Sequence, residues 1–222
     1  AFRDADYRLT PDEVSPEAIA AAKIVHASTF ALSKEPCRSA VQSAFESAHR
    51  QGKIVSLDPN YSPQIWRNRP EALEILAALF RFVTVTKASL DDARRLFGAE
   101  FSLRAAIDRF HRWGAETVVF TLGGAGSLVS RDGALVGYLP ARSIAIADAT
   151  GAGDAFWAGY LTALLDGHPP EMCLLFAREI VERKLQTVGT LRASINRTEI
   201  YRHIEKATDE IRYHWEDVPF NE

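Results

Sequence analysis

The chain has 222 residues, of which 47% are hydrophobic and 25% charged, a composition typical of a globular protein. Its 26 Lys and Arg residues are offset by 29 Asp and Glu residues, so the net charge of −3 offers no positive field for a nucleic-acid backbone. No apolar run reaches the roughly 20 residues that a membrane-spanning helix needs, so we expect neither a nucleic-acid nor a membrane partner. Cys37 and Cys173 stand alone without C-x-x-C spacing, which is typical of buried thiols in a reducing cytoplasm rather than of a disulfide framework or a zinc site.

The first half of the chain alternates short apolar runs with amphipathic runs. The apolar runs are too uniformly hydrophobic for a half-exposed strand, so they predict parallel strands covered on both faces, as in doubly wound α/β folds. The predicted strands are 23–27, 54–57, 82–86 and 117–122, and the predicted helices are 39–50, 71–78, 90–97 and 103–113.

The pattern changes after Leu122. Runs at 126–130 and 135–139 flank Asp132-Gly133, a dipeptide that tolerates the positive φ of a tight hairpin turn. Helices are predicted at 155–165, 172–186 and 198–207. No repeat or Pro/Gly/Ser-rich linker divides the chain, so we expect a single domain over residues 1–222. The only methionine is Met172, so we also expect the natural N-terminus to be missing.

The strongest motif is DATGAGDAFWAGYLTALL, which starts at Asp148. Gly151, Ala152 and Gly153 precede a predicted helix, and backbone amides at a helix N-terminus form an anion site. Asp154 lies at the entrance to this anion site, where a carboxylate could accept a proton from a hydroxyl group. A purely structural alternative is that Asp154 caps the helix beside a glycine turn.

DATGAGDAFWAGYL resembles the C-terminal signature of the ribokinase-like, or PfkB, carbohydrate kinases, and within them most resembles fructokinases and 2-dehydro-3-deoxygluconokinases. The resemblance covers nearly the whole chain but only the C-terminal majority of a family member, so we expect an N-terminally incomplete ribokinase-like domain. It implies that Asp154 is the catalytic base, that Gly151, Ala152 and Gly153 hold the transferred phosphoryl group, and that Asp148 lies near the phosphates or their cations.

Three further segments resemble parts of the same family. TLGGAG is similar to its loop over the nucleotide phosphates, which implies ATP contacts at Thr121, Gly123 and Gly126, although a strand turning into a hairpin also uses glycine. DPNYSPQIW is similar to a sugar-side segment, which implies substrate contacts at Asp58 and Asn60, although Asp58 before a proline also suits a turn.

TKASLDDARRLFG is similar to the family's N-x-x-E element, which implies that Asp92 contacts magnesium through a water molecule. The alternative is that Ser89 and Asp92 form a capping box at a helix start. FRDADYRLTP, residues 2–11, resembles the end of the family's lid strand over residues 1–10, with Arg3 facing the sugar, although a solvated Arg3 explains the residue equally well.

The resemblance therefore implies an ATP- and Mg²⁺-dependent kinase that phosphorylates a hydroxyl of a monosaccharide or sugar acid. We expect a cytoplasmic protein and a homodimer. The alternative is a non-catalytic sugar or nucleotide sensor on the same fold. A nicotinamide-dependent dehydrogenase is disfavoured, because TGAGD lacks the third glycine of G-x-G-x-x-G and GGAG leads into the β-rich SLVS.

Overall fold

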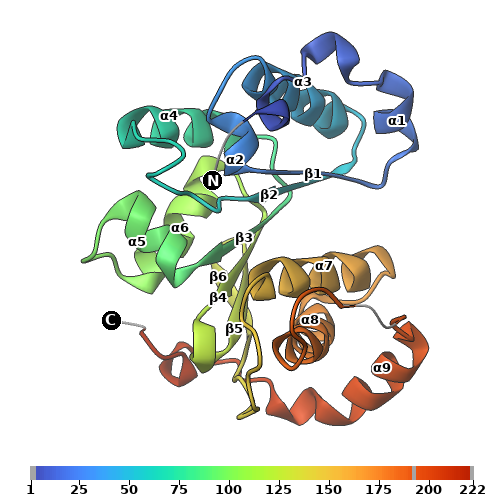
Figure 1. Cartoon of the computed structure of the whole chain (residues 1–222). Coiled ribbons are helices and arrows are strands. Elements are labelled where there is room, and N and C mark those ends of the chain that lie inside the picture. The colour runs from blue at the N-terminus through green and yellow to red at the C-terminus, as the bar shows by residue number, and fades with distance from the viewer. Residues whose placement is uncertain (1–3, 192–193, 221–222) are drawn as a thin grey trace. The chain divides into compact units, whose positions relative to one another are not determined.

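The computed structural model of the chain describes residues 4–191 and 194–220, and its internal contacts group them into two compact units (Figure 1). Of the described residues, the first unit contains those up to Phe120 and Arg131–Gly133, and the second contains Thr121–Ser130 and those from Ala134 to Phe220. The expectation of a single domain over 1–222 stays a prediction.

Six strands are hydrogen-bonded in the order in which they occur along the chain. The first three pair in parallel, with Ile24 opposite Ile54 and Ser56 opposite Val85. Flanked by helices, they confirm the predicted α/β class and mostly parallel sheet. The strands are β1 (Ile24–Ser28), β2 (Ile54–Asp58), β3 (Val85–Ser89), β4 (Thr117–Thr121), β5 (Ser127–Arg131) and β6 (Ala134–Leu139).

Four of the helices of the first unit follow a polar residue whose side chain accepts a bond from a first-turn amide. Asn68 accepts one from the Glu71 N–H and Ser102 one from the Ala105 N–H. A cluster of aromatic rings, with Phe110 in contact with Phe80 and Trp113, forms part of the core. The helices of this unit are α1 (Pro16–Ala21), α2 (Thr29–Leu32), α3 (Cys37–Arg50), α4 (Arg69–Phe80), α5 (Leu90–Phe97) and α6 (Leu103–Trp113), with 3-10 helices at Ala5–Tyr7 and Pro11–Glu13.

Two predicted strands differ from the structure. Strand β3 begins at Val85 instead of residue 82, because the amides of Phe82 and Val83 still bond to carbonyls at the end of α4. Residues 4–10 contain the 3-10 helix Ala5–Tyr7 and no strand, where the end of a lid strand was predicted. Arg3 lies outside the described residues.

The second unit contains the strands of the predicted hairpin, apart from the residues at its turn, and three helices. Asp132 and Gly133 join β5 to β6, with φ values of 52° and 82°. Helices α7 and α8 pack closely at Gly159, where an added Cβ would lie 3.0 Å from the Cα of Ala177. The helices are α7 (Ala152–Leu165), α8 (Pro170–Leu185) and α9 (Arg197–Ile204), with 3-10 helices at Gly123–Ala125, Glu205–Glu210 and Trp215–Asp217.

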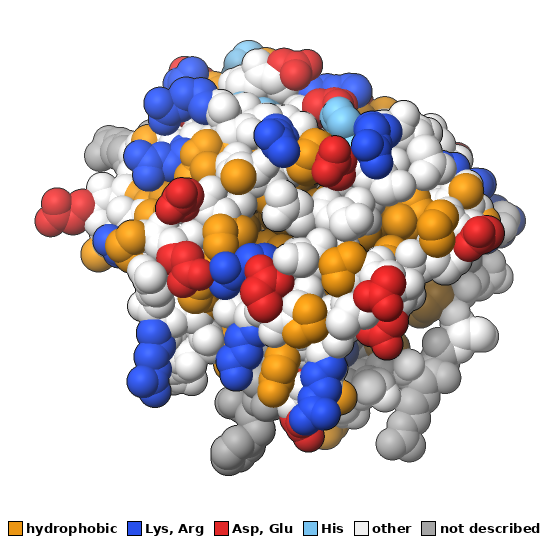
Figure 2. All heavy atoms as spheres, turned by 90° about the horizontal axis from the view of Figure 1, so that it is seen from above, with side chains coloured by type: hydrophobic (Ala, Val, Ile, Leu, Met, Phe, Trp, Pro, Cys, Tyr) orange, Lys and Arg blue, Asp and Glu red, His pale blue; other side chains and the backbone are white. Residues whose placement is uncertain are grey.

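Each unit buries one cysteine, Cys37 in α3 and Cys173 in α8, and neither forms a disulfide bond within the described residues. On the face shown in Figure 2, basic and acidic side chains of the described residues are interspersed with apolar ones. Within the described ranges, no helix is long and apolar enough to cross a membrane.

Candidate functional site

The N-terminus of α7 forms an open glycine turn. Gly151 is the N-cap residue and has a left-handed φ of 76°, and α7 begins at the next residue, Ala152. Gly151, Gly153 and Asp154 are exposed, and an added Cβ on Gly151 would meet only the Cε of Lys184 at 3.9 Å. No packed side chain therefore fills the space beside Gly151.

Asp154 is the third residue of α7 and not its cap, so the capping alternative for this side chain is wrong. Its exposed carboxylate lies in the first helical turn, where the helix dipole favours negative charge. The Ala152 N–H donates to the Ala149 carbonyl at 3.1 Å. Among the three residues predicted to hold an anion, Gly151 and Gly153 thus offer the better amides.

Asp148 fixes the segment that leads into this turn. Its Oδ1 accepts the Thr150 N–H at 2.9 Å, and its Oδ2 accepts the Gly189 N–H at 3.1 Å and the Lys184 ammonium at 3.3 Å. These bonds, chiefly those from the two amides, hold the pKa of Asp148 well below its usual range. Asp148 is therefore ionised, and both of its carboxylate oxygens accept bonds from other groups of the protein.

The glycine loop after β4 is a tight turn with an open tip. The Leu122 N–H donates to the Gly126 carbonyl at 2.8 Å, and the Tyr138 hydroxyl donates to the Ala125 carbonyl at 2.6 Å. Gly123 is exposed, with a φ of 60° and open space where a Cβ would be. Thr121, the last residue of β4, is half-buried.

Gly126 has a packing reason to be glycine. Its φ is 114°, and an added Cβ would collide with the Leu139 carbonyl oxygen and lie 2.8 Å from the Ala141 nitrogen. This close approach accounts for Gly126 without a nucleotide.

In the first unit, Asp58 ends strand β2 and forms a buried ion pair. Its Oδ2 accepts a bond from the Lys87 ammonium at 2.7 Å, and the two side chains are only 4% and 6% exposed. The geometry thus gives Asp58 a structural partner, and its contact with a sugar stays a prediction. Asn60, two residues further on, is half-buried.

Ser89 and Asp92 form the capping box that was the structural alternative. The Asp92 N–H donates to the Ser89 hydroxyl oxygen, while Asp92 Oδ2 accepts the Ser89 N–H at 3.0 Å and its hydroxyl at 2.6 Å. Burial, together with the nearby Asp58 charge, raises the pKa of Asp92 against the lowering effect of the Ser89 bonds.

These features fit a resident magnesium ion poorly, because Mg²⁺ prefers ionised, accessible carboxylates and Asp92 is only 4% exposed. Among residues 4–191 and 194–220, no group of three or more His, Cys, Asp or Glu side chains could hold a metal. The magnesium contact of Asp92 stays a prediction.

The structure thus brings Asp148 and Gly151 together in one unit, and Asp58 and Asp92 near each other in the other. The sequence interpretation missed the lysine in each group, Lys184 and Lys87. Lys87 carries a signal that could have been used, since a lysine inside an otherwise uncharged strand needs a buried partner.

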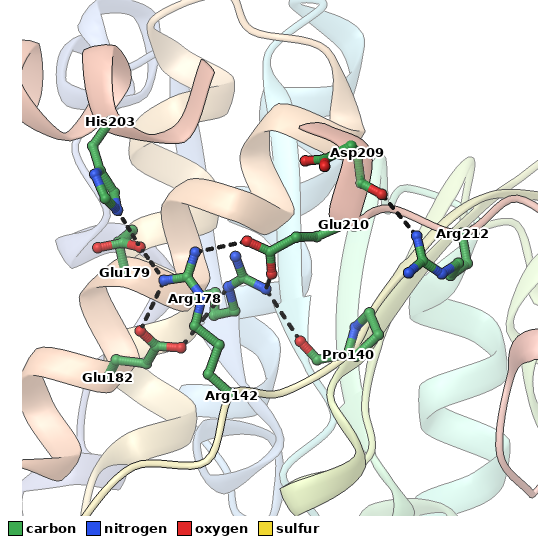
Figure 3. Close-up of polar contacts among 9 residues, drawn as sticks. All are labelled: Pro140, Arg142, Arg178, Glu179, Glu182, His203, Asp209, Glu210 and Arg212. Atoms are coloured by element: carbon green, nitrogen blue, oxygen red, sulfur yellow. Dashed lines mark hydrogen bonds and ion pairs between the residues drawn. The ribbon is translucent and has the colours of Figure 1, made fainter. Parts of the chain in front are cut away.

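A separate charged cluster links α8 to the C-terminal segment (Figure 3). Arg142 contacts Glu179 at 2.6 Å and Glu210 at 2.9 Å, and Arg178 contacts Glu210 at 2.6 Å. The bonds from Arg178 and Arg142 lower the pKa of Glu210 to about 2, whereas burial raises the pKa of Glu182. Arg178 is only 5% exposed, so these carboxylates compensate the cost of burying its charge.

Comparison with known sequences gives a match over most of the chain. Residues 2–195 match the family described as pfkB family carbohydrate kinase. An ATP-dependent 6-phosphofructokinase of Thermoanaerobacterium thermosaccharolyticum is 32% identical over 192 residues, which cover 86% of this chain and 58% of that protein. A fructokinase of Klebsiella pneumoniae is 31% identical over 84% of this chain and 59% of that protein. The chain therefore spans somewhat more than half the length of these two relatives.

Solved structures share the fold. A putative ribokinase II from E. coli aligns with a TM-score of 0.77 at 19% identity, over 90% of this chain and 64% of that one. An aminoimidazole riboside kinase from Salmonella enterica aligns with a TM-score of 0.75 at 22% identity, over 90% of this chain and 67% of that one.

Proposed function

Because this chain belongs to the pfkB family of carbohydrate kinases, we propose that it transfers the γ-phosphoryl group of Mg·ATP to a hydroxyl group of a monosaccharide or sugar acid. The observation that carries this proposal is the open Gly151 turn with an exposed Asp154 in the first turn of α7. A protein that only binds the nucleotide would need the turn to hold an anion, but it would not need the Asp154 carboxylate to accept a proton.

In the proposed reaction, the Asp154 carboxylate accepts the proton of the acceptor hydroxyl. The hydroxyl oxygen then bonds to the γ-phosphorus, and the bond from that phosphorus to the bridging oxygen breaks, so ADP leaves. The amides of Gly151 and Gly153 stabilise the charge on the phosphoryl oxygens as it passes. General-base assistance of this kind contributes about 10²- to 10⁴-fold in rate.

The nucleotide's phosphates would contact the exposed tip of the glycine loop at Gly123, beside Thr121. A solved neighbour, the putative ribokinase II from E. coli, is described in complex with ATP and Mg²⁺. For this chain we propose that magnesium arrives bound to ATP as part of the substrate, and that Asp148 acts by shaping the turn.

The acceptor is proposed from the relatives' names and the sugar-side segment. Fructose and 2-dehydro-3-deoxygluconate follow from the sequence resemblance, and fructose 6-phosphate follows from the relative named 6-phosphofructokinase. Asn60 is the better candidate for a direct sugar contact, because the Asp58 carboxylate is buried against Lys87. Cytoplasmic location and a homodimer belong to the same proposal.

The test is ADP release from Mg·ATP with these three acceptors, by this chain and by any longer natural form that contains it. We expect one acceptor to stimulate ADP release, and Asp154→Asn to lower kcat by about 10²- to 10⁴-fold with little change in KM. Asp108→Asn, an exposed aspartate of α6, is the matched control and should keep full activity.

Wild-type turnover in Asp154→Asn would disprove the role of the base. Binding of sugar or ATP by calorimetry without ADP release from any form would favour the sensor alternative.

A further inference from the structure

Lys184, near the end of α8, is buried although it carries a charge. Only 6% of the residue is exposed. Its ammonium nitrogen lies 3.2 Å from the Asp148 carbonyl oxygen, 3.3 Å from Asp148 Oδ2 and 3.3 Å from the Thr187 carbonyl oxygen. An ammonium group has three N–H donors, so these three oxygens account for all of them.

The three oxygens come from two chain segments that are far apart in sequence. One segment leads into α7 at Gly151, and the other follows α8. Further bonds join the same two segments, since the amides of Ala147 and Asp148 donate to the Leu185 carbonyl and Gly189 donates to Asp148. The Lys184 ammonium lies where they meet.

The Lys184 side chain also passes near the turn itself. Its Cε lies 3.9 Å from the position of a Cβ on Gly151, the residue that caps α7. We propose that Lys184 is a positioning residue, whose ammonium fixes the segment from Asp148 to Gly151 and thereby aims the amides of Gly151 and Gly153 at the transferred phosphoryl group. This inference rests on the proposed kinase function.

Geometry, rather than attraction of the phosphate, is the effect that we expect to dominate. Asp148 is ionised, because its bonds to amides lower its pKa, so Lys184 and Asp148 together present little net charge to an approaching anion. Loss of Lys184 should therefore misplace the amides more than it weakens ATP binding. A misplacement on the order of 1 Å lowers turnover by about 10²-fold.

The test compares Lys184→Ala with the neighbouring Arg183→Ala, which removes an exposed positive charge from the same turn of α8. We expect Lys184→Ala to lower kcat about 10- to 100-fold with a smaller change in KM for ATP, and Arg183→Ala to behave as wild type. Added butylammonium should restore part of the lost turnover, whereas tetramethylammonium, which has no N–H donor, should not.

Hydrogen exchange of the Thr150 and Gly189 amides, which bond to Asp148, gives a readout that needs no turnover. We expect faster exchange at both amides in Lys184→Ala. If Lys184→Ala fails to fold, the same measurement is made on Lys184→Met, which keeps the aliphatic stem. Unchanged exchange, or a loss of turnover that butylammonium and tetramethylammonium restore equally, would overturn the positioning role. If the wild-type chain releases no ADP, but the two amides still exchange faster in Lys184→Ala than in wild type, the result counts against the kinase function and not against the positioning role.

Discussion

Gly126 is the position in the glycine loop where a side chain costs most. Replacing it with alanine would place a Cβ against the Leu139 carbonyl oxygen and force a positive φ on an L residue. We expect Gly126→Ala to lower the free energy of unfolding by about 2 to 5 kcal/mol, measured by urea denaturation. Gly124→Ala is the matched control, because Gly124 has open space for a Cβ, and should change the stability by less than about 0.5 kcal/mol. Equal effects of the two substitutions would contradict this packing argument.

Residue identity alone could not separate these two glycines. The sequence predicted a nucleotide contact for Gly126 from its place in TLGGAG, whereas the structure gives a reason within the protein, the approach of the β6 terminus. The same limit applies to Asp148 and Asp58. Each stands in a motif, but its hydrogen-bond partners depend on backbone positions that only the folded chain defines.

At the scale of elements, the charged cluster holds the 3-10 helix Glu205–Glu210 against α8. We expect Glu210→Gln to lower the free energy of unfolding at pH 7 by about 1 to 3 kcal/mol, because Arg178 keeps its burial and loses a charged acceptor. The loss of unfolding free energy in Glu210→Gln relative to wild type should depend on pH.

The pKa of Glu210 falls from an ordinary 4.5 to about 2 in the folded protein. Its stabilisation is therefore complete above about pH 4.5 and is lost as the pH falls toward 2.

Urea denaturation of wild type and Glu210→Gln from pH 7 to pH 2.5 checks this. The two curves should converge at the acidic end. A gap that is constant over this range would mean that Glu210 acts through packing rather than through its charge.

Elements were more predictable than their contacts. The alternation of apolar and amphipathic runs predicted the six strands and the longer helices to within a few residues, because periodicity reports which face is buried. It missed the short helices α1 and α2. The error at β3 arose because Phe82 and Val83 are apolar but still belong to the turn that ends α4. The bond from Arg142 to Glu210 spans 68 residues and that from Lys184 to Asp148 spans 36, and no local pattern specifies such pairs.

For the whole molecule, the open question is whether the two compact units unfold as one. If residues 1–222 form a single domain, as the sequence predicts, Cys37 and Cys173 should become reactive with the same free energy of opening. Burial raises the pKa of Cys173 to about 12, so its thiol reacts only after opening. Thiol labelling at rising urea concentrations, followed by peptide mass spectrometry, measures the labelling rate of each cysteine. If one of the two cysteines is labelled at a much lower urea concentration than the other, the two units have separate stabilities.

One buried cysteine in each unit has a practical consequence for every substitution discussed above. A variant can be examined by labelling without any added dye or engineered cysteine, and the peptide that carries the label identifies the half of the chain that has loosened. Gly126→Ala, Glu210→Gln and Lys184→Ala all lie in the half that contains Cys173. If only that thiol gains reactivity, the damage is local, and if both do, the two halves share one cooperative transition.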